Sequence, residues 1–260
     1  MNAPDTFDRF KQKLSKNVYG SVKGVLRLTL LEKDLLEFCP GFTGDSLSIL
    51  DAGCGEGAFA NICLSMGHRL VLLDGSVHMV EKASRRCAKF IERGMARVVR
   101  DDFLQWDEQN GARFDVVLMH GSAEWMADSR KAILKGVEML RPGGILSLLM
   151  FNRDVHDMKR GINGHLIDGT PSRKKKLFPP QSQRVADTEQ ILRTMSGRVL
   201  LQSGIRIFHG FFRQMRSREM EKQQWIQQEL MYYREKPFTM LGQHSHFVWQ
   251  KNTSLDSGEF

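Results

Sequence analysis

A run of small and acidic residues, Asp51-Ala52-Gly53-Cys54-Gly55-Glu56-Gly57, has the composition of a ligand-binding turn. Glycines allow a backbone to pass close beneath a ligand and to adopt positive φ where a turn needs it. An acid, Asp74, ends the next apolar stretch about 20 residues further on, the spacing expected of a carboxylate that holds ribose hydroxyls. The pattern predicts a ligand that contains a nucleoside, although the glycines alone also fit dinucleotide enzymes.

The acids in this run narrow the choice of ligand. Asp51 stands just ahead of the glycines and Glu56 stands among them. Carboxylates here would repel a pyrophosphate, whereas they suit a ligand that carries an ammonium and a sulfonium group. These residues therefore favour S-adenosylmethionine over a dinucleotide. We interpret Cys54 as a small residue in a tight turn and not as a nucleophile.

Alternating strands and helices must position these residues. Apolar stretches predict strands at residues 47–50, 70–73, 97–99, 114–119 and 145–151. Helices are expected at residues 58–66 and from Ser76 to about residue 93. Continuous apolar strands separated by helices indicate a parallel sheet that is covered on both faces.

The residues that follow these strands are expected to meet at one edge of the sheet. Right-handed crossovers place the C-terminal ends of parallel strands at the same edge, where ligands bind in doubly wound folds. The residues with distinctive chemistry at these strand ends are Gly53, Asp74, Asp101, Asp102 and His120. Their coincidence at one predicted edge is stronger support for a ligand site than the glycine run alone.

The flanking segments are expected to add helices and two further strands. Amphipathic stretches predict N-terminal helices near residues 6–17 and 22–38. The polar stretch at residues 152–184 predicts an insertion or loop. Asp187 is expected to cap a helix that runs to about residue 196. Strands are expected at residues 199–208 and 246–250, with a charged helix at about 215–231 between them and a polar tail from residue 253.

These expectations describe an α/β chain with a Rossmann-like fold. The sheet is predicted to be mostly parallel and seven-stranded, with helices on both faces, N-terminal helices and a basic insertion after the fifth strand. We expect a single domain over residues 1–260. Its predicted parts are a helical cap (1–45), a donor-binding core (46–152), the basic insertion (153–186) and the C-terminal part of the sheet (187–260).

The net charge of +8 is distributed unevenly along the chain. Residues 49–151 carry 13 basic and 13 acidic side chains, whereas residues 152–260 carry 18 basic and 11 acidic ones. The excess therefore lies outside the expected ligand site. A basic excess suggests a polyanionic partner such as nucleic acid, with a basic solvated surface as the alternative.

Several classes of protein are disfavoured. The N-terminus has no apolar segment typical of a secretory signal, and no stretch approaches the roughly 18 apolar residues of a membrane span. The 4 cysteines lack C-x-x-C spacing, so neither a zinc site nor a disulfide framework is indicated. We expect a cytoplasmic protein with reduced thiols, no metal, no membrane association and no evident obligate protein partner.

The glycine run resembles the first motif of class I methyltransferases, D-x-G-C-G-x-G. This resemblance implies that Gly53 and Cys54 line the methionine part of S-adenosylmethionine and that Asp74 holds its ribose. Asp101-Asp102 would then lie near the adenine. His120 would flank the methionine portion or the reaction centre.

Further segments resemble the bacterial tRNA 5-carboxymethoxyuridine methyltransferases. The most specific are Lys13-Leu14-Ser15-Lys16-Asn17-Val18-Tyr19-Gly20-Ser21-Val22-Lys23-Gly24-Val25-Leu26-Arg27 and Gly204-Ile205-Arg206-Ile207-Phe208-His209. The other matching segments are Leu50–Gly57, His120 through Glu124-Trp125, Arg141–Ser147, Lys174–Lys176, Arg213, Leu241-Gly242 and His246. The resemblance covers nearly the whole chain, in order.

The resemblance implies methylation of the carboxylate of 5-carboxymethoxyuridine at the wobble position of certain tRNAs. Arg27 would join the donor site and bind the methionine carboxylate as a bidentate partner. The implied cofactor-binding set is Arg27, Asp51, Gly53, Cys54, Gly55, Asp74, Asp101, Asp102 and His120. Two residues depart from the family pattern: Cys54 stands where a glycine is usual, and Asp102 stands where relatives carry a small residue.

A carboxylate acceptor is already a nucleophile at neutral pH, so the reaction requires no general base. The positioning candidates are Tyr19, Arg206 and His209. The expected substrate-binding set is Tyr19, Lys23, Lys174, Lys175, Lys176, Arg206, His209 and Arg213, with the lysine run as a phosphate clamp for the anticodon stem-loop. Aromatic residues that could receive an unstacked base are Tyr19, Trp125, Phe151, Phe208 and Phe211, although core packing is favoured for Phe151 and Phe208.

Two other functions remain open at this stage. The same fold could methylate a small-molecule carboxylate or a quinone-type metabolite, which would not need a basic insertion. Alternatively, the chain could be a non-catalytic RNA-binding module that retains the donor pocket for structural reasons.

Overall fold

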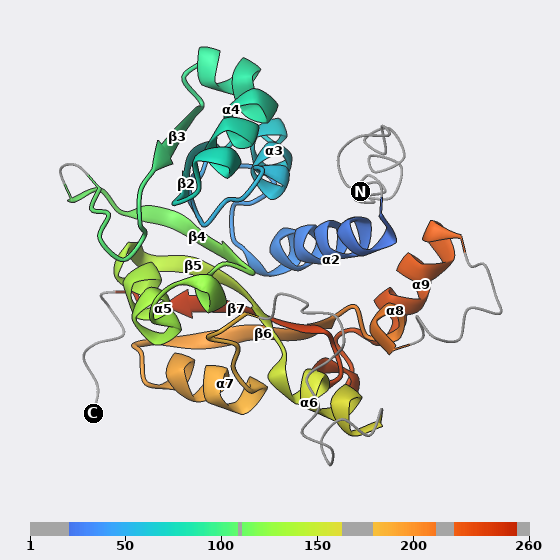
Figure 1. Cartoon of the computed structure of the whole chain (residues 1–260). Helices are drawn as coiled ribbons and strands as arrows, with labels where there is room; N and C mark the ends of the chain where they lie inside the picture. The colour runs from blue at the N-terminus through green and yellow to red at the C-terminus, as the bar shows by residue number, and fades with distance from the viewer. Residues whose placement is uncertain (1–20, 109–110, 163–178, 212–220, 254–260) are drawn as a thin grey trace.

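One mixed sheet forms the centre of the computed structural model, which describes residues 21–108, 111–162, 179–211 and 221–253 (Figure 1). Its strands, within these described residues, are β1 (Ser48–Ala52), β2 (Arg69–Asp74), β3 (Ala96–Arg100), β4 (Phe114–His120), β5 (Leu140–Phe151), β6 (Gly197–Ile205) and β7 (His244–Lys251). They lie in the order β3-β2-β1-β4-β5-β7-β6, and β7 runs antiparallel to both neighbours. The predicted seven-stranded, mostly parallel α/β fold is confirmed.

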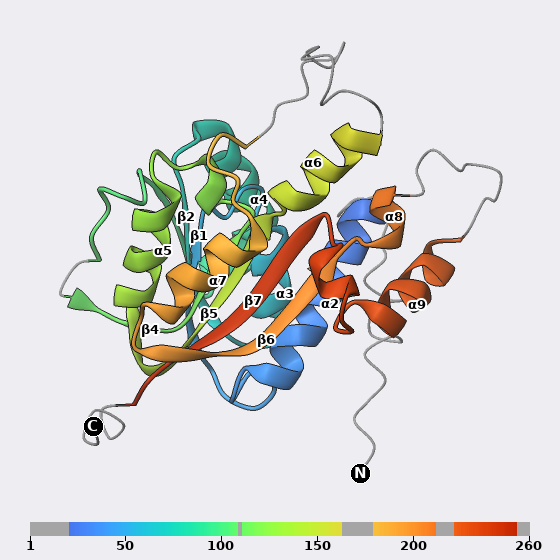
Figure 2. The same cartoon turned by 90° about the horizontal axis from the view of Figure 1, so that it is seen from below.

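Helices cover both faces of the sheet (Figures 1 and 2). One face packs against α2 (Val22–Phe38), α3 (Ala58–Ser65) and α4 (Val77–Glu92). The opposite face packs against α5 (Ser129–Glu138) and α7 (Val185–Arg193). The remaining helices are α6 (Arg153–Ile162), α8 (Phe208–Phe211) and α9 (Lys222–Tyr232), with short 3-10 turns η2 (Ala123–Trp125) and η4 (Phe238–Met240). Each face therefore buries its own apolar core.

The ligand edge lies where the strand order reverses. β1 pairs in parallel with β2 on one side and with β4 on the other, so the chain crosses from one half of the sheet to the other around β1. Ligands bind in doubly wound folds at such a switch point, beyond the C-terminal ends of the strands. The glycine turn, Asp74 and His120 all follow strands that end here.

Several predicted boundaries differ from the structure. β5 begins at Leu140 and not at residue 145, because Pro142 and the adjoining glycines continue the strand instead of turning it. β6 ends at Ile205, three residues before the predicted end. α7 begins at Val185 with Arg184 as its N-cap, so Asp187 lies in its first turn, where a carboxylate favours the helix dipole. α9 lies in the later part of the charged helix expected at 215–231, and residues 215–220 of that expectation lie outside the described residues.

The segment expected to be a loop contains a helix, α6. Its only buried residue is Val155, and its high polarity hid the apolar periodicity on which the sequence reading depended. Asn152 fixes its start, since Oδ1 accepts the Val155 N–H while Nδ2 donates to the carbonyls of Met240 and Gly242. The helix is thereby tied to the segment that leads into β7.

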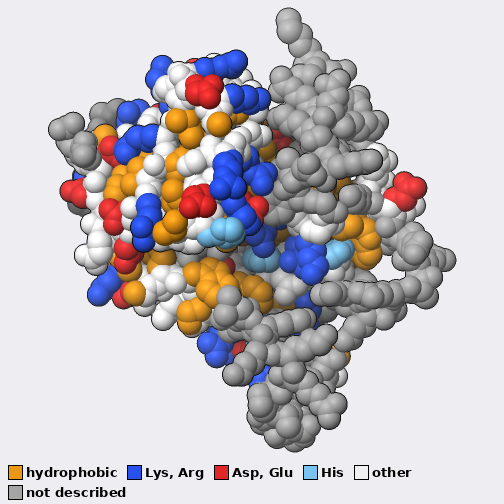
Figure 3. Space-filling model, turned by 45° about the horizontal axis from the view of Figure 1, so that its top comes forward, with side chains coloured by type: hydrophobic (Ala, Val, Ile, Leu, Met, Phe, Trp, Pro, Cys, Tyr) orange, Lys and Arg blue, Asp and Glu red, His pale blue; other side chains and the backbone are white. Residues whose placement is uncertain are grey.

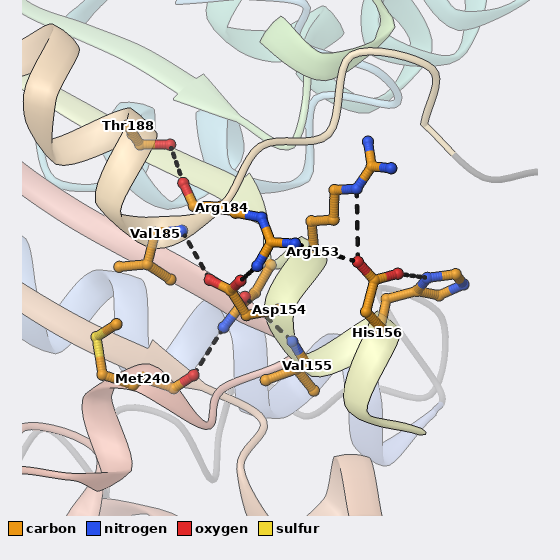
Figure 4. A network of polar contacts seen from close by, with 10 residues as sticks. Arg153, Asp154, Val155, His156, Arg184, Val185, Thr188 and Met240 are labelled. Atoms are coloured by element: carbon orange, nitrogen blue, oxygen red, sulfur yellow. Dashed lines mark hydrogen bonds and ion pairs between the residues drawn. The ribbon is translucent and has the colours of Figure 1, made fainter. Parts of the chain in front are cut away.

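Ion pairs tie α6 to α7 as well (Figure 4). Arg184 donates to Asp154 at 2.8 Å, and the other Asp154 oxygen accepts the Val185 N–H at 3.1 Å. Arg153 and His156 both contact the Asp157 carboxylate (Figure 4). These contacts set the direction in which α6 projects its remaining side chains, among them Lys159.

The division into cap, core, insertion and C-terminal part stays a prediction. The expected helix at residues 6–17 lies outside the described residues. Within the described parts of the chain, no helix combines the length and the apolar character that crossing a membrane requires.

Candidate functional site

The glycine turn after β1 is held close to its neighbours. The N–H groups of Gly53 and Cys54 donate to the Leu73 carbonyl of β2 at 2.7 and 3.0 Å. Gly53 has a φ of 80°, and a Cβ added to it would lie 2.3 Å from Cβ of Ser122. Gly55 also has positive φ (54°), but a Cβ there would point into open space. Only glycine fits at residue 53, and the turn leaves space above residue 55.

Asp74 is oriented by two backbone amides. Its Oδ2 accepts the Gly55 N–H and its Oδ1 accepts the Ser76 N–H, both at 2.9 Å. Ser76 also caps α4, since its side chain accepts from the Met79 N–H. Each carboxylate oxygen retains a second lone pair. The carboxylate is therefore held ready for two further donors, such as the hydroxyls of a ribose.

Asp51 is a buried carboxylate whose charge has no counterpart nearby. Its residue is 3% exposed, and no hydrogen bond or ion pair joins its side chain to another of the described residues. Burial, together with the negative charge of Asp74, raises the pKa of Asp51 to about 7. A buried carboxylate of this kind is stabilised by a cation. The ammonium of S-adenosylmethionine supplies one, so these residues fit that cofactor.

Glu56 does not have the role that the sequence suggested. Its carboxylate accepts from Lys82 at 2.5 Å and from Arg86 at 3.4 Å, both in α4. Its charge is therefore balanced within the protein, and Asp51 alone among the two acids remains to select a cationic ligand. Cys54 fits the prediction that it is no nucleophile, because burial raises the pKa of its thiol far above the usual range.

Asp101 and Asp102 lie beside Asp74 but make local contacts. The Asp101 N–H donates to the Asp74 carbonyl at 3.3 Å, which aligns the ends of β2 and β3. The Asp101 side chain accepts the Asp102 N–H, and the Asp102 side chain accepts the Leu104 N–H. Both carboxylates are exposed. Their place next to Asp74, the candidate for binding the ribose, suits a contact with the adenine. That contact stays a prediction.

Arg27 reaches the site from α2. Its Nη2 lies 3.2 Å from Nε2 of His244 at the start of β7. A guanidinium only donates hydrogen bonds, so this histidine nitrogen accepts. Burial, and then the charges of Arg27, Arg206 and Lys159, lower the pKa of His244 well below its ordinary value. Arg27 Nη1 would lie 3.9 Å from a Cβ on Gly121, so the guanidinium stands between the ends of β4 and β7.

His120 stands at the end of β4, on the face covered by α2 and α3. Its ring meets Phe59 of α3 edge-on, with centroids 4.7 Å apart, and its Nε2 lies 2.8 Å from Ser147 Oγ. Burial lowers the pKa of His120 well below its ordinary value, and the charge of the nearby Arg27 lowers it further. The imidazole is therefore neutral.

Arg206 is held in an unusual conformation. It is the one residue other than glycine, among those described, with a positive φ (63°). Such a conformation is costly and is found preferentially where function requires it. Its Nη2 donates to Gln243 Oε1 at 3.4 Å, and Lys159 Nζ donates to the same oxygen at 3.3 Å. Arg206 and Lys159 thus form a pair of cations that faces His244.

Lys159 was missed by the sequence reading because it lies in the segment expected to be a loop. Burial, together with the charge of the adjacent Arg206, lowers its pKa to about 8. Glu124 was also missed as a candidate. It is 2% exposed, its Oε1 accepts the Phe151 N–H at 3.2 Å, and burial raises its pKa to about 7. Its place just after β4, in the segment from His120 to Trp125 that resembles the family, was the signal in the sequence.

The remaining predicted residues fall in two groups. His209 lies on α8, where its N–H donates to buried Glu229 and its ring packs edge-on against Trp225 of α9. Lys23 lies one turn before Arg27 on α2 and is half-buried. Predicted residues that lie outside the described parts of the chain are Tyr19, Lys174, Lys175, Lys176 and Arg213.

The aromatic candidates differ in exposure. Trp125, in η2 just beyond His120, is 45% exposed. Phe151 is half-buried and meets His244 edge-on with centroids 5.6 Å apart, whereas Phe208 packs with Tyr232 and Phe238. Of the three candidates Trp125, Phe151 and Phe208, Trp125 is therefore the most accessible to an unstacked base, and core packing holds for Phe208. Nothing is described for the side chain of Phe211, and Tyr19 lies outside the described residues.

The surface agrees with an anionic substrate. Figure 3 shows Lys, Arg and His side chains gathered across the middle of one face of the molecule, next to apolar ones. Among the described residues, no group of three or more His, Cys, Asp or Glu side chains is arranged to hold a metal ion.

Comparisons with known proteins agree with this geometry. A family model described as a methyltransferase domain matches residues 49–144, which include the glycine turn, Asp74 and His120. Among solved structures, magnesium protoporphyrin IX methyltransferase from Synechocystis PCC 6803 with bound SAH has a similar fold. The TM-score is 0.60 at 14% sequence identity, with 95% of this chain and 94% of that chain covered.

Two curated relatives cover different shares of the chain. The tRNA 5-carboxymethoxyuridine methyltransferase of Escherichia coli (strain K12) is 30% identical over 262 aligned positions, which cover 96% of this chain and 97% of the relative. The ubiquinone biosynthesis O-methyltransferase of Chelativorans sp. (strain BNC1) is also 30% identical, but over only 54% of this chain and 56% of the relative.

Proposed function

The chain belongs to the tRNA 5-carboxymethoxyuridine methyltransferase family, and we propose that it methylates the carboxylate of 5-carboxymethoxyuridine at the wobble position of tRNA. It is an S-adenosylmethionine-dependent methyltransferase. The product is the methyl ester of the modified uridine. The proposal also implies a cytoplasmic enzyme, since its substrate is tRNA.

The donor site is proposed to extend from Asp74 to Arg27 along the C-terminal edge of the sheet. Asp74 would bind the ribose hydroxyls, Asp51 the ammonium, and Arg27 the methionine carboxylate as a bidentate pair. Asp101 and Asp102 would lie near the adenine. S-Adenosylmethionine supplies an electrophilic methyl group on a sulfonium. The protein therefore has only to align an acceptor with it.

The arrangement of the Arg206–Lys159 cation pair is the observation that carries the proposal. Arg206 and Lys159 share the Gln243 side chain and face His244, which itself contacts Arg27 of the donor site. A carboxylate is nucleophilic when ionised, so no side chain has to remove a proton from it. Arg206 and Lys159 would each bind through one oxygen lone pair and leave another free for in-line attack. The left-handed backbone at Arg206 fixes the direction of its guanidinium.

Recognition of the RNA is proposed to involve the anticodon stem-loop. The excess positive charge of residues 152–260 suits a polyphosphate backbone. Lys174, Lys175 and Lys176 are proposed as phosphate contacts, and Trp125 as an exposed surface on which an unstacked base could pack. Tyr19, Lys23, His209 and Arg213 remain further candidates for the substrate side.

The second candidate is methylation of a small-molecule carboxylate or quinone-type metabolite. The match to the ubiquinone biosynthesis O-methyltransferase favours it, but that match covers about half of the chain. Such an enzyme would be insensitive to salt, because phosphate contacts would not contribute to substrate binding. A non-catalytic RNA-binding module would bind the donor without turnover.

The test is nucleoside mass spectrometry of tRNA that lacks the final methyl ester, after incubation with protein and S-adenosylmethionine. We expect one added methyl on 5-carboxymethoxyuridine. The gain should be lost with Asp74→Ala and with Arg27→Ala, and should be retained with Lys131→Ala, an exposed lysine on α5. Absence of a gain, with donor binding intact by calorimetry, would rule out the tRNA function and point to small carboxylic acids.

A further inference from the structure

A chain of buried polar side chains runs behind His120, across the sheet to α2. Nε2 of His120 in β4 lies 2.8 Å from Oγ of Ser147 in β5, which lies 2.8 Å from Nε2 of His246 in β7. Nδ1 of His246 lies 2.7 Å from Oδ2 of Asp34 in α2. Ser147, His246 and Asp34 are each 0% exposed. Since water does not reach these groups, the groups themselves decide which of them donates and which accepts in each hydrogen bond.

The Asp34 end of the chain has a fixed polarity. Arg234 donates to Oδ1 of Asp34 through Nε at 3.0 Å and Nη2 at 2.7 Å, and Ser203 donates to Oδ2 at 2.7 Å. Burial alone would raise the pKa of Asp34, but its contacts with His246, Arg234 and Ser203 together hold that pKa below the ordinary value. An ionised carboxylate only accepts hydrogen bonds. His246 therefore carries a proton on Nδ1.

Charge balance decides the state of the other nitrogen of His246. Arg234 already compensates the charge of Asp34, and its other partner, Glu37, is half exposed and screened by water. A second proton on His246 would place an uncompensated positive charge among buried groups, which is costly. Nε2 of His246 is therefore an acceptor.

The hydroxyl of Ser147 transmits this polarity to His120. It has a single proton, which it donates to Nε2 of His246, so its oxygen accepts from His120. His120 must then carry its proton on Nε2, and its Nδ1 has a free lone pair. His120 is partly exposed, and Nδ1 has no hydrogen-bond partner among the described residues. The lone pair is left for a ligand of the site.

We propose that Ser147, His246 and Asp34 are positioning residues that hold His120 as the Nε2–H tautomer, so that its Nδ1 accepts a hydrogen bond from the ammonium of the donor. The inference rests on the proposed place of His120 beside the methionine part of the donor. In the opposite tautomer an N–H group would face the ammonium, and two donors would oppose each other. The buried residues Ser147, His246 and Asp34 thus determine whether His120 strengthens or weakens binding of the donor.

The first measurement is a long-range nitrogen–proton correlation spectrum of the full chain with nitrogen-15 in its histidines. Its cross-peak pattern distinguishes the two tautomers of a neutral imidazole. We expect His120 to be Nε2–H in the wild type, with and without S-adenosylhomocysteine. An Nδ1–H pattern for His120 in the wild type would overturn the proposal without the need for any variant.

The second measurement compares Ser147→Ala with Ser203→Ala by calorimetry. Both variants remove a buried hydroxyl from the same network, but only Ser147 lies between His246 and His120. We expect Ser147→Ala to raise the Kd for S-adenosylhomocysteine about tenfold, the effect of one lost hydrogen bond to a charged group. It should also abolish the single-tautomer pattern of His120. Ser203→Ala should leave both unchanged.

An analogue in which hydrogen replaces the ammonium provides the decisive control. The wild type and Ser147→Ala should bind this analogue equally well, because the contact that the tautomer controls is missing. A tenfold difference that persists with this analogue would show a general structural effect and overturn the proposal. Both measurements concern donor binding only, so their outcome is independent of whether tRNA proves to be the acceptor.

Discussion

The predicted donor site contains two carboxylates, Asp51 and Asp74, and one guanidinium, that of Arg27. The surroundings of each carboxylate explain how it could bind a ligand. Asp74 has two backbone amides to orient it, and Asp51 is buried without a counter-charge. The positions of Asp51 and Asp74 at strand ends were enough to name them as candidates, because a residue that ends a parallel strand is placed by the sheet itself. Arg27, in α2, was named only from the family resemblance. The contacts of all three residues with the donor stay predictions.

Asp51 makes donor binding depend on pH. Burial raises its pKa to about 7, so the carboxyl becomes protonated, and loses its attraction for the ammonium, as the pH falls below that value. Calorimetry with S-adenosylhomocysteine should show the affinity falling by up to about tenfold per pH unit below about 7. Asp51→Asn should bind weakly at every pH. Glu124→Gln removes another buried carboxyl of similar pKa and should leave the pH dependence of donor affinity unchanged. A wild-type affinity that does not change with pH would contradict the proposed role of Asp51.

Lys159 makes acceptor binding depend on pH in the opposite sense. Its pKa is lowered to about 8, so its positive charge is present below that value and is lost as the pH rises through it. The KM for tRNA should therefore rise above about pH 8. Lys159→Arg, which stays charged, should remove the rise, while Lys159→Gln should raise KM about tenfold at every pH. An unchanged KM in Lys159→Gln would exclude Lys159 from the acceptor site.

Among elements, the glycine turn is constrained at Gly53 by the neighbouring Ser122. Gly53→Ala combines a left-handed backbone with a clash against Ser122, and we expect it to lower the free energy of unfolding by roughly 2–5 kcal/mol. Gly55→Ala meets open space and should cost only about 1–2 kcal/mol, but its methyl group would enter the proposed donor site. Urea denaturation measures the first effect and calorimetry the second. Equal stability losses would contradict this description of the turn.

Helix α2 is anchored through Asp34. Arg234→Ala would leave that buried carboxylate without its cation, and we expect a loss of about 3–5 kcal/mol in the free energy of unfolding. Glu37→Ala removes the half-exposed partner of the same guanidinium and should cost less than about 1 kcal/mol. Chemical denaturation of the two variants tests the contrast. A small loss in Arg234→Ala would mean that α2 is held mainly by its apolar contacts.

Elements were predicted well where apolar residues recur and poorly where they do not. The core strands and α2, α3 and α4 carry continuous or periodic apolar residues, and their existence was predicted. α6 buries only Val155 and is held by Asn152 and by ion pairs to α7, and side-chain partners of this kind cannot be read from a single sequence. As a consequence Lys159 was missed.

At the scale of the whole molecule, the distribution of charge suggests how RNA is bound. The lysines at 174–176 lie outside the described residues, so their contribution is best tested in solution. Replacing all three by Ala should weaken tRNA binding and reduce the slope of log affinity against log salt by roughly 2–3. The matched control replaces three exposed cations in and between α4 and β3, namely Lys89, Arg93 and Arg100. An unchanged slope in the lysine variant would show that the run is merely solvated.

The sequence by itself determined the fold class and the ligand edge, because strand-end positions and glycine spacing follow from local chain geometry. The donor residues named from it stay predictions. Only the tertiary structure decided which distant residues meet. The antiparallel β7 brings His246 beside Ser147, and α2 brings Asp34 to the same point. The backbone of Arg206 turns its guanidinium towards Lys159. Such contacts join residues that are far apart in the chain, and they depend on how the helices pack on the two faces of the sheet. A local sequence pattern therefore does not predict them.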